Sequence, residues 1–159
     1  MIKRVFTQVF AVVGAILEKD GKVLLVRENK TSARGLWNQP AGWPDVGEDL
    51  IASVRREVKE ETGFDFQPTG LVGVYSLVKG PDARVEATRH AVKLIFRGTF
   101  GGQALASNEE IQEVKWFAPE EIYAMDSSTL RDLDIKQEVK DYFAGKNYPL
   151  EIIRHTLSK

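Results

Sequence analysis

Apolar residues gather in several short segments that have the character of strands. They first dominate residues 9–17 and, after the turn-forming pair Asp20-Gly21, residues 22–27. Two apolar runs joined by such a turn are typical of a β-hairpin, which we expect over residues 9–27. Three later segments, rich in β-branched and aromatic residues, predict further strands: residues 70–78, 91–100 and 114–117.

A different period appears in residues 50–62. There Ile51, Val54 and Val58 recur at the three- to four-residue spacing of one helix face. Gly63 follows at once, and glycine is the residue best suited to a left-handed helix cap. The pattern therefore predicts a helix that buries one face against a sheet and ends at Gly63.

Two more helices are expected in the C-terminal third. One covers residues 135–143 and is closed by Gly145; a shorter one covers residues 119–124 and begins with Pro119, a favoured first-turn residue. Strands interleaved with a few helices indicate an α/β fold, with a mixed sheet that carries helices on its faces.

Composition narrows the picture further. The 159 residues contain no repeat or linker, so we expect a single domain over residues 1–159. The net charge of −1 favours neither nucleic acid nor an anionic membrane as a partner. Cysteine is absent, which excludes disulfides, thiolate metal sites and a cysteine nucleophile, and suits a reducing, cytoplasmic location.

The N-terminus invites comparison with a signal peptide, because Lys3 and Arg4 precede an apolar run. Thr7 and Gln8 interrupt that run, however, and no small-residue cleavage site follows it. The run is also too short to span a membrane. We therefore expect a strand here.

The candidate chemistry lies in residues 42–64, GWPDVGEDLIASVRREVKEETGF. On the predicted helix, Glu57, Glu60 and Glu61 stand at i, i+3 and i+4, so their carboxylates converge on one face. Arg56 can reach Glu60 one turn along. An excess of carboxylate oxygen of this kind suits the hard cations Mg²⁺ or Mn²⁺.

A glutamate-rich helix alone is most often a solvated face, so the spacing of the whole segment decides. That spacing resembles the Nudix box of the Nudix (MutT-like) hydrolase family without a departure: Gly42, five residues, Glu48, seven residues, Arg56-Glu57, aliphatic Val58, one residue, Glu60-Glu61, one residue, Gly63 and apolar Phe64. The resemblance implies a Nudix-type α/β/α sandwich with a glutamate-bearing catalytic helix. It also implies hydrolysis of a phosphoanhydride bond in a nucleoside di- or triphosphate or a related nucleoside diphosphate compound.

By this resemblance, Glu57, Glu60 and Glu61 coordinate Mg²⁺ or Mn²⁺, and Gly42 offers its backbone carbonyl to the metal. Arg56 is expected to orient the glutamates. The implied chemistry is attack of an activated water on phosphorus, after a carboxylate has taken a proton from that water.

The identity of that general base stays open. In the family it is either the first box glutamate, here Glu57, or an acid on a later loop. Glu109 and Glu110 stand where such a loop acid is expected, and we take Glu110 as the candidate. A plain acidic loop before the strand at residues 114–117 explains the same pair equally well.

Three segments resemble the NudJ-type phosphatases more closely: LWNQPAG at residues 36–42, STLR at 128–131 and NYPLEII at 147–153. Members of that subgroup act on nucleoside di- and triphosphates and on the pyrophosphate of the thiamine pyrimidine precursor. Trp43 departs from the pattern, because the subgroup usually carries histidine there, and this leaves the substrate open. ADP-ribose or another nucleotide sugar is the alternative substrate class. Pro81 lies at roughly the distance past the box where ADP-ribose pyrophosphatases carry a proline, but loop prolines are too common for this to decide the substrate.

For the substrate itself we expect contacts from Trp43, Arg27 and Arg34. The Trp43 ring, in a glycine-flanked loop, offers a surface on which a base can stack. Arg27 and Arg34 are candidates for phosphate binding, as are Arg89 and Lys93, although such charges are more often solvated.

Two other functions were weighed. Allylic diphosphate isomerases on this fold need a catalytic cysteine, which the chain lacks. A catalytically silent nucleotide sensor usually has eroded box glutamates, and here all of them are intact. The expected partner is a small nucleotide or pyrophosphate substrate, and the sequence leaves open whether the protein forms a homodimer.

Overall fold

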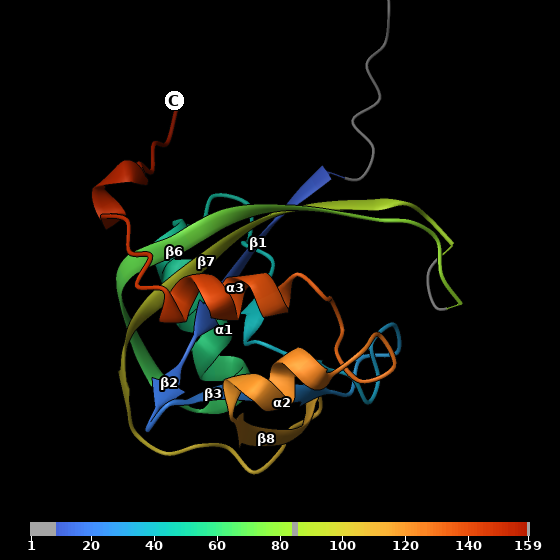
Figure 1. Cartoon of the computed structure of the whole chain (residues 1–159). Coiled ribbons are helices and arrows are strands. Elements are labelled where there is room, and N and C mark those ends of the chain that lie inside the picture. Colours follow the sequence, from blue (N-terminus) through green and yellow to red (C-terminus); the bar gives the residue numbers. More distant parts are fainter. Residues whose placement is uncertain (1–8, 84–85, 159) are drawn as a thin grey trace, which may run out of the picture.

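A computed structural model describes residues 9–83 and 86–158 (Figure 1). Its helices are α1 (Leu50–Thr62), α2 (Pro119–Ala124), α3 (Ile135–Phe143) and the short 3₁₀ helix η1 (Leu150–Ile152). Its strands are β1 (Val9–Ile16), β2 (Glu18–Lys19), β3 (Lys22–Glu28), β4 (Trp37–Asn38), β5 (Ala41–Gly42), β6 (Asp65–Lys79), β7 (Arg89–Gly101) and β8 (Ile111–Phe117). The three predicted helices have the expected bounds. Lys3, Arg4, Thr7 and Gln8, weighed above as parts of a signal peptide, lie outside the described residues.

The strands form two sheets. In the first, the order is β5-β1-β7-β6, with β1 parallel to β7 and the other neighbours antiparallel. The second consists of β2, β3 and β4, with β8 paired to β3, and all of its pairs are antiparallel. The first sheet is therefore mixed, as the sequence predicted.

The predicted hairpin over residues 9–27 was wrong in its first half. β1 pairs with β7 and β5 in the mixed sheet, while only the short β2 forms a hairpin with β3. The turn lies at Asp20 and Gly21, whose φ values of 52° and 77° are those of a tight hairpin turn. The distant β7 thus competes successfully for β1, a pairing that local sequence does not reveal.

β6 is five residues longer at its start than the strand predicted from residue 70, and it contains Pro68. Proline has no N–H to donate and is therefore tolerated mainly on edge strands or at irregularities. β6 is the edge strand of its sheet, and its register with β7 shifts between Pro68 and Gly70. Both conditions are met, so the strand continues through the proline.

Helices cover the sheets from two sides (Figure 1). Val54 and Val58 of α1 pack in one buried cluster with Leu71 of β6 and Phe96 of β7. Helices α2 and α3 belong to a second cluster, built on the list Ile16, Val23, Leu25, Val72, Ile95, Ile122, Ile135 and Val139. The predicted α/β/α arrangement is confirmed.

Helix α1 is fixed at both ends. The Asp49 side chain accepts hydrogen bonds from the backbone N–H groups of Ile51 and Ala52, which satisfies donors that a helix start leaves open. At the other end, Gly63 has a φ of 82° and its N–H donates to the carbonyl of Lys59. The glutamates of α1 are therefore carried on a well-defined element.

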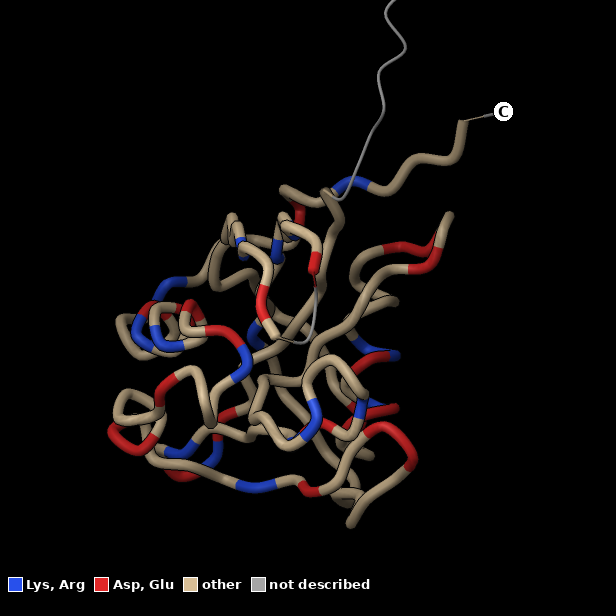
Figure 2. The backbone as a smooth tube through the Cα atoms, turned by 90° about the vertical axis from the view of Figure 1, so that its right-hand side faces the viewer, with Lys and Arg blue, Asp and Glu red and all other residues tan. Residues whose placement is uncertain are grey.

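Charges are interspersed along the chain. Figure 2 shows Lys/Arg and Asp/Glu segments close to one another over the fold, in keeping with the net charge of −1. Within residues 9–83 and 86–158, no helix is both long and apolar enough to cross a membrane.

Candidate active site

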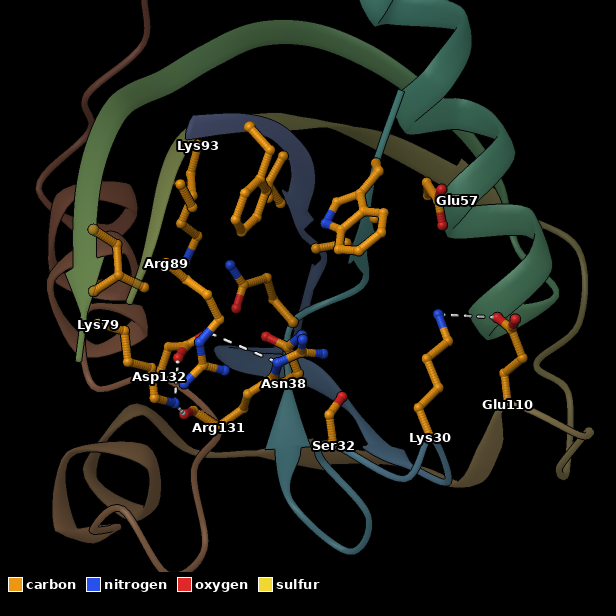
Figure 3. A pocket seen from close by; sticks show the side chains of 18 of the residues that line it. Lys30, Ser32, Asn38, Glu57, Lys79, Arg89, Lys93, Glu110, Arg131 and Asp132 are labelled. Atoms are coloured by element: carbon orange, nitrogen blue, oxygen red, sulfur yellow. Dashed lines mark hydrogen bonds and ion pairs between the residues drawn. The ribbon is translucent and has the colours of Figure 1, made fainter. Parts of the chain in front are cut away.

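A cavity of about 660 Å³ lies where β1 and β7 begin and β6 ends, and residues of both sheets and of α1 line it. Its walls come from β1, β4, β5, α1, β6 and β7, and from the loops that contribute Lys30, Trp43, Glu110 and Arg131. Figure 3 shows Lys30, Glu57 and Glu110 on one side of it. A cavity of this size is typical of small-molecule sites.

Arg56 organises the acidic side of the cavity. Its guanidinium donates to both carboxylate oxygens of Glu48, from Nε at 2.8 Å and from Nη2 at 2.9 Å. Its Nη1 donates to Glu57 at 2.9 Å and to Glu60 at 3.2 Å. The hydrogen bonds with Arg56 lower the pKa of Glu48 to about 2. One guanidinium thus joins the loop before α1 to two of its glutamates, as the spacing predicted for Glu60.

Glu57 lies almost against the backbone of Gly42. A Cβ added at Gly42 would stand 2.1 Å from Cδ of Glu57, so any side chain at this position would displace the Glu57 carboxylate. Glu57 is also buried, and burial raises the pKa of its carboxyl, although Arg56 acts in the opposite direction. Both residues lie in the cavity wall, where the Gly42 backbone and the Glu57 carboxylate are neighbours.

Glu61 lies deeper, only 2% exposed. Its carboxylate accepts a hydrogen bond of 2.9 Å from the backbone N–H of Ala41. Burial raises the pKa of Glu61 well above its usual range, and the nearby charges of Glu28 and Glu57 raise it further. Because burial disfavours the ionised form, holding the Glu61 carboxylate in this position lowers the stability of the folded protein when Glu61 is ionised.

Lys30 lies near these acids, and the sequence analysis did not identify it as a site residue. Its ammonium lies 3.3 Å from a carboxylate oxygen of Glu110. Burial lowers the pKa of Lys30, but Glu61, Glu110 and Glu28 together raise it above its usual value. Of the two loop acids considered above, Glu110 lines the cavity, whereas Glu109 contributes its backbone carbonyl to a hydrogen bond with Asn29.

Of the three residues predicted to contact the substrate, only Trp43 lines the cavity. Trp43 lines the cavity, is 66% exposed and meets Phe10 edge to face at 5.6 Å. Arg27 and Arg34 do not belong to the cavity wall: Arg27 donates to the carbonyl of Gly35, and Arg34 is exposed on the same turn. Their assignment as phosphate ligands stays a prediction that the geometry does not support.

Sequence reasoning overlooked other wall residues on the opposite side of the cavity: Asn38, Gln39, Lys79, Arg131 and Asp132. Two signals pointed to some of them. Asn38 and Gln39 belong to LWNQPAG, and Arg131 ends STLR, both segments noted for their resemblance to other proteins. Arg89 and Lys93, named above as weaker candidates, also lie here.

Comparison with known proteins identifies the family of the chain. The family model described as NUDIX domain matches residues 7–138. The chain belongs to the Nudix family.

Nudix relatives align with most of the chain. An ADP-ribose pyrophosphatase from Methanocaldococcus jannaschii is 30% identical over 146 residues, covering 91% of this chain and 79% of that protein. Phosphatase NudJ from Escherichia coli is 30% identical over 141 residues, covering 89% and 88%. The solved structure of a NUDIX hydrolase from Nitrosomonas europaea matches with a TM-score of 0.79 and 32% identity, covering 94% and 98%. The predicted Nudix hydrolase identity is confirmed.

A divalent metal fits this Nudix site in the chemistry of its donors. Glu57, Glu60 and Glu61 supply carboxylate oxygens, and Gly42 supplies a backbone carbonyl next to Glu57. Among the described residues, no three acidic or histidine side chains already form a closed metal-binding group. Instead, Nη1 of Arg56 bridges Glu57 and Glu60 and offsets part of their charge. Hard oxygen donors in excess of positive charge are what Mg²⁺ or Mn²⁺ prefers.

Proposed function

We propose that the protein hydrolyses a phosphoanhydride bond in a nucleoside di- or triphosphate, or in a related pyrophosphate compound, with Mg²⁺ or Mn²⁺. The carrying observation is the cavity wall in which Glu57, Glu60 and the Gly42 backbone meet, held together by Arg56. NudJ is named as a phosphatase and the archaeal relative as an ADP-ribose pyrophosphatase. Both names fit bond cleavage at phosphorus.

Glu57, Glu60 and Glu61 would hold the metal, with Gly42 adding its carbonyl. When bound, Mg²⁺ neutralises diphosphate oxygens and makes a nearby water more acidic. Arg56 orients two of these glutamates through a single nitrogen, and Glu48 in turn fixes the guanidinium by two hydrogen bonds. Positioning of this kind supports catalysis because the carboxylates need not reorganise during the reaction.

Glu110 is our candidate for the general base, with Glu57 as the alternative. Glu110 lines the cavity, and its carboxylate lies 3.3 Å from the Lys30 ammonium, which holds it there. Glu110 would take the proton from the attacking water, whose oxygen forms the new bond to phosphorus while the anhydride P–O bond breaks. Glu57 accepts a hydrogen bond of 2.9 Å from Arg56 and is assigned above to the metal, so Glu110 is the first candidate to take the proton.

Trp43 and Phe10 offer an aromatic wall for the rest of the substrate. The Trp43 ring is largely exposed and is supported edge to face by Phe10. A flat base or pyrimidine can stack on such a ring. This wall supports a nucleoside or a pyrimidine pyrophosphate over a purely inorganic substrate.

ADP-ribose hydrolysis is the second candidate, favoured by the 30% identity to the archaeal ADP-ribose pyrophosphatase over 91% of the chain. That relative and NudJ are equally similar in identity, so the comparisons support both substrate classes.

The test is a substrate panel with Mg²⁺ that follows orthophosphate and pyrophosphate release, with a chelator as control. It should contain nucleoside di- and triphosphates, ADP-ribose, nucleotide sugars and thiamine-pathway pyrophosphates. We expect chelator-sensitive hydrolysis of at least one class. Nucleotide binding without any hydrolysis would favour the silent sensor instead.

Three further expectations belong to this proposal. We propose that residues 1–159 act as a single domain and that the enzyme is cytoplasmic with small-molecule substrates. Sedimentation would test whether a homodimer forms, and fractionation would test the location.

A further inference from the structure

The side of the cavity opposite the glutamates is rich in cations. Figure 3 shows Lys79, Arg89, Lys93 and Arg131 gathered there, away from Lys30, Glu57 and Glu110. At this end the wall contains one acidic side chain, Asp132. The proposed hydrolysis of a diphosphate uses none of these groups.

Arg131 is held firmly from behind. Its Nη1 donates to Oε1 of Glu28 at 2.5 Å, and Glu28 is only 2% exposed. Asn38 donates to the same carboxylate oxygen at 2.8 Å. The backbone N–H of Arg131 also donates to the carbonyl of Trp37, which ties its loop to β4. Among the described residues, only Glu28 accepts a hydrogen bond from this guanidinium, while Nε lies 3.9 Å from a carboxylate oxygen of Asp132. The guanidinium therefore keeps N–H groups with which to bind a ligand.

Arg89 is oriented in a similar way. Its Nη2 donates to Asp82 at 2.7 Å and to the carbonyl of Gly80 at 3.4 Å. Its Nε is buried and has no hydrogen-bond acceptor within the described part of the chain. A buried N–H without an acceptor is costly, and such a group usually has a partner in the working state of the protein.

The two lysines differ. Lys93 is 4% exposed and lies between Asp134 and Glu138, so its charge is balanced inside the protein. Lys79 is about one third exposed, and its ammonium donates to the carbonyl of Arg131 and to Asp132, each at 2.9 Å. Lys79 therefore fixes the Arg131 loop and still reaches the cavity.

The carboxylates that hold these cations lie mostly outside the wall. The cavity wall includes Lys79, Arg89 and Arg131. It does not include the acids Glu28, Asp82, Asp134 and Glu138. These four acids hold the cations from outside the wall, whereas Asp132, within the wall, pairs with Lys79 and Arg131. Guanidinium groups in such an arrangement bind phosphate or carboxylate through paired hydrogen bonds.

We propose that Lys79, Arg89 and Arg131, the distal cluster, bind a second anionic group of the substrate, a phosphate or a carboxylate, beyond the bond that is cut. This inference rests on the proposed function. The wall also contains apolar Val12, Leu77 and Ala91, which suits a ring or sugar in the same substrate. The substrate class is then a pyrophosphate whose other end carries an acid.

The test compares matched pairs that share the pyrophosphate and differ only in the far group. UDP-glucuronate against UDP-glucose tests a carboxylate, and ADP with a 3′-phosphate against ADP tests a phosphate. We expect the acidic member of at least one pair to have a kcat/KM about tenfold higher or more, mainly through a lower KM, as one charge-assisted hydrogen bond would give. The pair that shows the preference identifies the anion.

Variants assign the preference to the cluster. Arg89→Gln should reduce the ratio within the preferred pair about tenfold, and Arg131→Lys should reduce it less than Arg131→Gln. Arg97→Gln, on the same strand as Arg89 but outside the cavity wall, should leave the ratio unchanged. Dissociation constants of the same pairs, measured on Glu60→Gln, report the preference even where turnover is lost, and thermal midpoints identify misfolded variants.

Equal kcat/KM and equal dissociation constants within both pairs would overturn the distal cluster while leaving the hydrolase intact. A preference that survives Arg89→Gln and both Arg131 variants would overturn it as well. Binding preference without any hydrolysis would contradict the proposed function and support the cluster.

Discussion

Gly42 and Glu57 illustrate how tightly single residues define the acidic side of the cavity. The glycine has no side chain, and the Glu57 carboxylate occupies the space where one would be. The pair therefore brings the Gly42 backbone close to a carboxylate, which would let both residues supply oxygens to one cation.

Gly42→Ala should displace the Glu57 carboxylate, because the new Cβ would lie within 2.1–2.3 Å of its atoms. We expect turnover to fall by about tenfold or more, since small misplacements of catalytic groups are costly. Steady-state kinetics with Mg²⁺ would measure it. Gly101→Ala is the matched control, because a Cβ there meets nothing within 4 Å. Unchanged turnover in Gly42→Ala would show that the Glu57 position is not critical.

Residues close in sequence were predictable, and those brought together by the sheet were not. Glu57, Glu60 and Arg56 share a helix, whose geometry fixes their spacing. Arg89 and Arg131, in contrast, meet only because β7 joins the mixed sheet and because the loop before α3 bonds to Trp37. Such contacts depend on pairings between distant segments, which a single sequence does not specify.

Helix α3 is attached to the mixed sheet by buried polar groups as well as by apolar packing. Glu138 is fully buried, lies 2.5 Å from the Lys93 ammonium and accepts a hydrogen bond from Gln39 at 2.6 Å. Nearby, Tyr75 of β6 donates to Asp141 at 2.8 Å. The sequence predicted a helix over residues 135–143 but not its polar anchoring, because the partners come from the β4–β5 connection, β6 and β7.

The anchoring makes stability depend on pH. Burial raises the pKa of Glu138 to about 7, although Lys93 lowers it, whereas an ordinary glutamate titrates near 4.5. The folded state thus binds this proton more tightly than the unfolded chain does. The resulting stabilisation is complete below about pH 4.5 and is lost as the pH rises through about 7.

We therefore expect the free energy of unfolding of the wild type, relative to Glu138→Gln, to fall between these pH values. The change should be on the order of 3 kcal/mol and should level off above pH ~7. Urea unfolding at several pH values would measure it, with Glu151→Gln as an exposed control. A difference between wild type and Glu138→Gln that does not vary with pH would contradict the assignment.

The molecule as a whole places one cavity across both sheets, with acids at one end and cations at the other. This arrangement has two causes. Strand β1 pairs with the distant β7 and not with β2 or β3, and the consecutive strands β4 and β5 belong to different sheets. The strand composition predicted a mixed α/β fold, but the local hairpin signal at Asp20-Gly21 led to the wrong partner for β1.

Mg²⁺ should stabilise the folded protein. Burial and neighbouring charges disfavour the ionised forms of Glu57 and Glu61 and raise their pKa values, and a bound cation would offset this electrostatic cost. We expect the thermal midpoint to rise by several degrees, on the order of 3–5 °C, at millimolar Mg²⁺. NaCl at matched ionic strength is the control. A midpoint that responds equally to both salts would argue against a specific metal site.

The central claim is that the α1 glutamates carry hydrolysis, and kcat of Glu60→Gln with Mg²⁺ tests it most directly. Glu60 is about half exposed, so the substitution should leave folding unchanged. Glu113→Gln, equally exposed on β8, is the matched control. We predict a fall in kcat of about a hundredfold or more for Glu60→Gln, since a lost metal ligand removes several kcal/mol of transition-state stabilisation. Wild-type turnover in Glu60→Gln would contradict the account.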